Sequence, residues 1–113
     1  MSQLLEASYS GLQLDPRGSK IDFEFDFSPI KTFEFELKNP SPSDEIKQIE
    51  LVSNLPTQSY TITENVTSLG PAQTKIQKIE VNSDVLVEFA KKNSGFIPYV
   101  SWHYLRIIHL FGG

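Results

Sequence analysis

The carboxylates of two alternating segments are the most concentrated reactive groups in this sequence. They occur at every second position of residues 22–26 and 34–36, as Asp22, Glu24, Asp26, Glu34 and Glu36. On neighbouring strands such rows place like charges opposite each other, which destabilises a sheet. A calcium ion would relieve this repulsion, but carboxylates that alternate along a strand stand about 6.5 Å apart and do not converge on one ion. Three interpretations remain: a solvated face relieved by Lys20, Lys31 and Lys38, a docking surface for a basic region of a partner protein, and, least favoured by this spacing, a metal site.

The two histidines are the other candidates for metal binding or catalysis. His103 and His109 share one face of a predicted strand but lie six residues apart, about 20 Å at 3.3 Å per residue, which is too far for one metal ion. Ser101 stands beside His103 without converging on it, and no Gly-x-Ser-x-Gly turn surrounds the serine. The sequence also lacks cysteine and a glycine-rich phosphate loop. We therefore expect a protein without catalytic activity, metal or cofactor.

Length and charge limit the architecture and the partners. A chain of 113 residues has the size of one domain, so we expect a single domain over residues 1–113. The net charge of −4 and the absence of a Lys/Arg stripe argue against nucleic acid as a partner. The first residues contain no basic segment followed by a long apolar run. This pattern predicts a soluble protein without a cleaved signal peptide or membrane insertion.

Short strands are predicted along most of the chain. Residues 20–27 and 31–38 alternate apolar with charged side chains, which is typical of strands that bury one face. Further strands are expected at residues 46–52, 60–64 and 75–81, and the last should contain a bulge because its apolar residues are spaced by three and then by two. Asp15-Pro16-Arg17-Gly18 has the composition of a type I turn, so we expect a hairpin around it.

One short helix is predicted at residues 83–92. Asn82 or Ser83 can cap its start, Asp84 and the pair Lys91-Lys92 suit the two ends of its dipole, and Gly95 can adopt a left-handed conformation after it. The alternative is a strand through residues 85–89, because short apolar runs do not distinguish the two by periodicity.

The C-terminal segment, residues 96–111, contains a strand without a clearly polar face. Its aromatic and β-branched residues favour a strand from Tyr99 to Leu110. Apolar side chains occur on both sides, so this strand should be either central in the fold or covered by another chain. We expect residues 100–105 to complete the core. The residues expected to contact a neighbouring subunit are Ile107, Ile108, His109, Leu110 and Phe111.

Seven to eight short strands separated by turns predict an all-β protein, an antiparallel β-sandwich with one short helix. Two segments carry a resemblance to a known group of proteins: residues 32–40, Thr-Phe-Glu-Phe-Glu-Leu-Lys-Asn-Pro, and residues 69–76, Leu-Gly-Pro-Ala-Gln-Thr-Lys-Ile. They resemble the immunoglobulin-like modules of bacterial and archaeal surface proteins and of phage virions, which pair an alternating strand ending in Asn with a later Pro/Gly turn. The resemblance implies an immunoglobulin-like sandwich with a scaffold or adhesion role and transfers no catalytic residue.

These features together predict a non-enzymatic structural or adaptor subunit of a homo- or hetero-oligomeric protein assembly. A virion, a tail or a surface lattice would suit such a subunit. The alternative is a monomeric β-sandwich that binds carbohydrate or a small ligand through exposed aromatic side chains. Its candidate residues are Tyr99, Trp102 and Tyr104.

Overall fold

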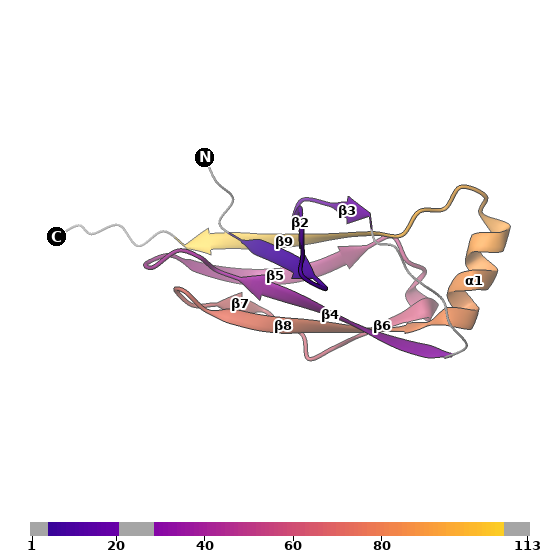
Figure 1. Cartoon of the computed structure of the whole chain (residues 1–113), viewed down its shortest axis with the longest axis horizontal. Coiled ribbons are helices and arrows are strands. Elements are labelled where there is room, and N and C mark those ends of the chain that lie inside the picture. The colour runs from indigo at the N-terminus through magenta and orange to yellow at the C-terminus, as the bar shows by residue number, and fades with distance from the viewer. Residues whose placement is uncertain (1–4, 21–28, 108–113) are drawn as a thin grey trace.

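Two antiparallel β-sheets form the body of the protein in a computed structural model that describes residues 5–20 and 29–107 (Figure 1). One sheet has five strands in the order β2-β1-β4-β8-β6: Leu12–Leu14, Glu6–Tyr9, Ile30–Lys38, Thr74–Asn82 and Tyr60–Thr63. The other has four strands in the order β3-β9-β5-β7: Ser19–Lys20, Tyr99–Ile107, Glu45–Ser53 and Ser68–Leu69. The prediction of a mainly β protein with one helix is confirmed. The described residues contain nine strands, more than expected, because β2, β3 and β7 have only two or three residues each.

The core lies between the two sheets and follows the alternation of β4. Phe33, Phe35 and Leu37 are buried there, whereas Glu34 and Glu36 on the opposite face are exposed. From the other sheet, the Trp102 ring meets the Phe35 ring edge-on, with 5.5 Å between ring centroids. Burying a side chain of this size contributes roughly 1.5–3 kcal/mol, so these contacts across the core hold the two sheets together.

The prediction of a bulge in β8 is wrong, and a bulge occurs in β5 instead. β8 pairs with β4 in one continuous register, so Ile76 points outward, 39% exposed, and Gln77 takes the buried position. In β5 the register shifts between Lys47 and Glu50, and the extra residue, Gln48, has a φ of 55°. Both segments space their apolar residues by three and then by two. The polar side chain of Gln77 can be buried in β8 because it is fully hydrogen-bonded.

Gln77 secures the connection between β6 and β7. Its side-chain oxygen accepts a hydrogen bond from the Val66 backbone N–H at 2.8 Å, and its amide group donates to the backbone oxygen of Lys78 at 3.0 Å. A second donation reaches the Thr63 oxygen at 3.5 Å. These hydrogen bonds hold the loop against β8.

The turn at Asp15–Gly18 is confirmed, but the hairpin expected around it is wrong. The Gly18 backbone N–H donates to the Asp15 oxygen at 3.0 Å, and the flanking strands β2 and β3 belong to different sheets. The reason lies in the contacts of the turn with β9: the Trp102 N–H donates to the Pro16 oxygen at 2.8 Å, and a Cβ at Gly18 would stand 2.5 Å from the Tyr99 ring. The chain therefore crosses from one sheet to the other at this turn.

The first hairpin is instead formed by β1 and β2. Its register pairs Tyr9 with Leu12 across Ser10 and Gly11, whose φ values of 52° and 80° are both positive. Positive φ at both central residues defines the type I′ turn that two-residue hairpins prefer.

The helix is confirmed as α1, Ser83–Lys92, so the alternative strand is wrong. The Asn82 side chain caps it by accepting from the Val85 N–H at 3.2 Å. Within the helix, Leu86 is buried. The helix covers one end of the sandwich beside the 3₁₀ turn Thr57–Ser59 (Figure 1). Gly95 has the left-handed φ of 83°, in a turn just after the helix.

Asn39 closes the other end of the sandwich. Its fully buried side chain donates to the backbone oxygens of Asp44 and Gly70 at 2.8 and 2.9 Å, and it accepts from the Ser41 N–H at 3.1 Å. One amide thus connects the end of β4, the loop before β5 and the turn between β7 and β8.

Candidate interaction surface on strand β9

Strand β9 is an inner strand of the four-stranded sheet. Along one side it pairs with β5, from Ser53 opposite Val100 to Glu45 opposite Ile107. Along the other side, the described residues of β3 pair with it at Tyr99 and Val100. The predicted strand is confirmed as far as Ile107, and its central position agrees with one of the two alternatives drawn from its sequence.

The two faces of β9 differ in exposure. Val100 and Trp102 are buried, and Tyr104 packs against the core on the same face. On the outer face, His103 is exposed and Leu105 is 47% exposed. Apolar residues therefore occur on both faces of β9, but in the single chain only the inner face is buried and the outer face is exposed to solvent.

Beyond Trp102, one side of β9 has no strand partner among the described residues. The backbone groups of successive residues in a strand point to opposite sides. Because the Trp102 N–H points away from β5 to the Pro16 oxygen, the backbone groups of Tyr104 and Arg106 point to that side too. We call this side of residues 103–107 the free edge.

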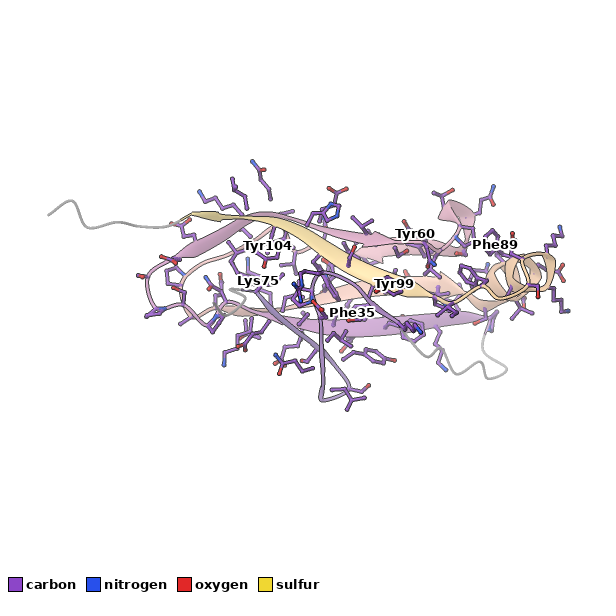
Figure 2. All side chains as sticks on the ribbon, turned by 90° about the horizontal axis from the view of Figure 1, so that it is seen from above. Phe35, Tyr60, Lys75, Phe89, Tyr99 and Tyr104 are labelled. Atoms are coloured by element: carbon purple, nitrogen blue, oxygen red, sulfur yellow. The ribbon has the colours of Figure 1, made fainter. Side chains whose placement is uncertain are left out.

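The structure does not gather the aromatic residues of the ligand-binding alternative. Trp102 is only 2% exposed and lies in the core, as does part of Tyr104, whereas Tyr99 is 41% exposed on the outer face. Tyr99 and Tyr104 are also well separated along β9 (Figure 2). No platform of exposed aromatic rings is therefore formed by these three residues.

The histidine candidates are likewise separated from other reactive groups. His103 is exposed on the outer face, opposite Glu50 of β5, and Ser101 lies opposite Val52. His109 is outside the described residues. Within residues 5–20 and 29–107, no group of three or more His, Cys, Asp or Glu side chains is placed to hold a metal ion.

The two acidic residues of β4 lie on the outer face of the five-stranded sheet. Glu34 is opposite Lys78 of β8, with 4.0 Å between the carboxylate and ammonium groups, and Lys78 also reaches Glu64 at 3.4 Å. Glu36 lies opposite Ser8 and Ile76. The charge of Glu34 is therefore relieved by Lys78, a residue the sequence did not single out. The other members of the predicted rows, Asp22, Glu24 and Asp26, lie outside the described residues.

The predicted docking residues are only partly described. Ile107 is the last residue of β9 and pairs with Glu45, whereas residues 108–111 lie outside the described part. Sequence reasoning placed the contact at the end of the strand and missed the free edge beside Tyr104. The free edge begins where the contact between Pro16 and Trp102 ends. The position of Pro16 is set by a segment far from β9 in the sequence.

Comparison with known proteins gives no relative from which a role could be carried over. No protein-family model, curated protein or solved structure matches the chain. In the part of the chain that is described, no helix has the length and apolar character needed to cross a membrane.

Proposed function

We propose that this protein is a non-enzymatic structural or adaptor subunit of a larger protein assembly, such as a virion, a tail or a surface lattice, and that it docks through strand β9. The free edge is the observation that carries the proposal. Its backbone N–H and C=O groups have no strand partner among the described residues and can accept an additional strand, which is a common mode of protein recognition. Leu105 supplies exposed apolar surface beside it.

The proposed docking surface continues from the free edge into residues 107–111. These residues, Ile-Ile-His-Leu-Phe, are of the types that favour a strand and an apolar contact. Glu34 and Glu36 lie on the outer face of the other sheet, so a partner that binds them would use a second surface.

We also propose that the sandwich is of the immunoglobulin-like type. The two segments that carry the resemblance meet at one end of the molecule, where Asn39 donates to the Gly70 oxygen. This contact gives the strand that ends in Asn and the later Gly-Pro turn a common structural role.

Site-specific photo-cross-linking would test the docking proposal. A photoreactive amino acid at Leu105, introduced in the cells that naturally make the protein, should give discrete cross-linked protein bands. The matched control is Glu88, which is exposed on α1, at the end of the sandwich opposite to the one at which β9 finishes (Figure 1). Equal labelling from both positions, or no protein cross-link from Leu105, would rule out docking through β9.

A further inference from the structure

We propose that the free edge of β9 pairs with the free edge of a second copy of this chain, antiparallel and with Leu105 on the two-fold axis. The inference rests on the proposed function, since it names the partner at the same edge. It would join the two four-stranded sheets into one continuous sheet across the dimer.

The available backbone groups allow such a pairing. Tyr104 and Arg106 both present an N–H and a C=O to the free edge, as the Trp102–Pro16 hydrogen bond shows for the same side of the strand. In an antiparallel pair centred on Leu105, Tyr104 of each copy lies opposite Arg106 of the other. All four N–H groups then meet a carbonyl group.

The neighbouring registers are less favourable. Centring on His103 or Tyr104 would require Trp102 to join the new pairing, but its N–H is already bonded to Pro16. Centring on Arg106 would place this cationic residue opposite its own copy, which is destabilising. Of the registers that stay within residues 103–107, the one centred on Leu105 remains.

The same register brings an apolar contact to the centre of the outer face. Leu105, 47% exposed in the single chain, would lie directly opposite Leu105 of the second copy. This is a non-hydrogen-bonded position, at which opposed Cα atoms stand about 4.5 Å apart. Five paired residues bury little surface, so the dimer should be weak and should dissociate on dilution.

A pair of cysteine variants tests both the partner and the register. The natural sequence has no cysteine, so Leu105→Cys introduces a single thiol. In the proposed dimer the Leu105→Cys thiols of the two copies lie opposite each other, within reach of a disulfide bond. In the His103→Cys variant the two thiols would be separated by four residues along the strand, at least about 13 Å. Under mild oxidation at high protein concentration we expect Leu105→Cys to cross-link at least tenfold faster than His103→Cys. Equal rates would overturn the register, and no cross-link from either variant would overturn the dimer.

A backbone variant provides an independent readout. Arg106→Pro removes an N–H that points to the free edge and leaves the hydrogen bonds to β5 intact, while Arg106→Ala removes only the charged side chain. Light scattering over a concentration series should show a dimer for the natural chain and for Arg106→Ala, and a monomer for Arg106→Pro, with circular dichroism confirming that each is folded. A natural chain that stays monomeric at high concentration would refute this inference. The proposed function would survive that result if Leu105 still cross-linked to a different protein in cells.

Discussion

Two buried side-chain amides hold the loops of this protein onto its sheets. Asn39 is fully buried and Gln77 is 1% exposed. Asn39 bonds to loop backbone at Asp44, whereas Gln77 accepts from the loop N–H of Val66 and donates to the oxygen of Lys78 in its own strand. An amide buried without partners would destabilise the fold, whereas one with all its partners fixes a loop in one position. Polar residues are thus responsible for the geometry of both loop regions.

Replacing Asn39 by Ala should destabilise the protein by about 2–3 kcal/mol, because buried backbone groups of the surrounding loops lose their partner. The free energy of unfolding from denaturant titration measures this change. Asn65, which is exposed, provides the control, and Asn65→Ala should change the stability by less than about 0.5 kcal/mol. Similar effects of the two substitutions would contradict the role given to Asn39.

Trp102, the only tryptophan, should report the core directly. Because its ring is 2% exposed and packs against Phe35, its fluorescence in the folded protein should be blue-shifted and resistant to quenching by acrylamide. Unfolding in denaturant provides the internal control, since it should move the emission to the red. A red-shifted, readily quenched emission from the folded protein would contradict the burial of Trp102 and reopen the ligand-binding alternative.

At the scale of the element, the sequence pattern correctly predicted the features that depend on interactions between residues close in sequence. The alternation of β4, the Asn82 cap of α1 and the Asp15–Gly18 turn each depend on residues close in sequence, and each was found where expected. The spacing of apolar residues by three and then by two, which β5 and β8 share, did not show which of the two strands contains a bulge. Whether a strand bulges or buries a polar residue depends on a distant partner, here the Val66 loop that satisfies Gln77.

One turn leaves room for stabilisation. In Gly70–Gln73, closed by a hydrogen bond of 3.1 Å, Ala72 has a φ of 59° at the position where a type II turn favours glycine. Ala72→Gly should therefore raise the free energy of unfolding by about 0.5–1 kcal/mol, as relief of strain exceeds the added freedom of the unfolded chain.

The control for this substitution is Ala90→Gly. Ala90 is exposed in α1, where glycine is unfavourable, so this change should lower the stability by up to about 1 kcal/mol. Thermal and chemical denaturation should give opposite signs for the two variants. The interpretation of the turn would be wrong if both were destabilising.

At the scale of the whole molecule, the order of the strands in the two sheets could not be predicted from the sequence pattern. β4 lies between β1 and β8, and the crossing at Pro16 places β2 and β3 in different sheets. These choices depend on total burial across the core rather than on any one segment. The sequence pattern also did not predict which face of β9 is buried: Tyr99 and Leu105 are exposed on the outer face, and exposed residues of these types are common on protein surfaces. Docking at residues 107–111 stays a prediction.

Hydrogen exchange should distinguish the two sides of β9. In dilute solution the amides of Tyr104 and Arg106, which face the free edge, should exchange faster than those of His103 and Leu105, which face β5. Mass spectrometry or NMR would measure these rates residue by residue. Raising the protein concentration should slow the exchange of Tyr104 and Arg106 selectively. Equal protection of all four amides in dilute solution would show that another segment already covers the edge.

The pairing of β5 with β9 also affects how the protein is made. Glu45 of β5 lies opposite Ile107, so the ribosome must add about sixty further residues after Glu45 before this pairing can close. During that interval, Ile46 and Leu51 of β5 lack the strand that later covers one of their sides. Contacts between such distant segments also form slowly in folding. Newly made chains therefore pass through a period in which the side of β5 that later binds β9 is open to other polypeptides in the cell.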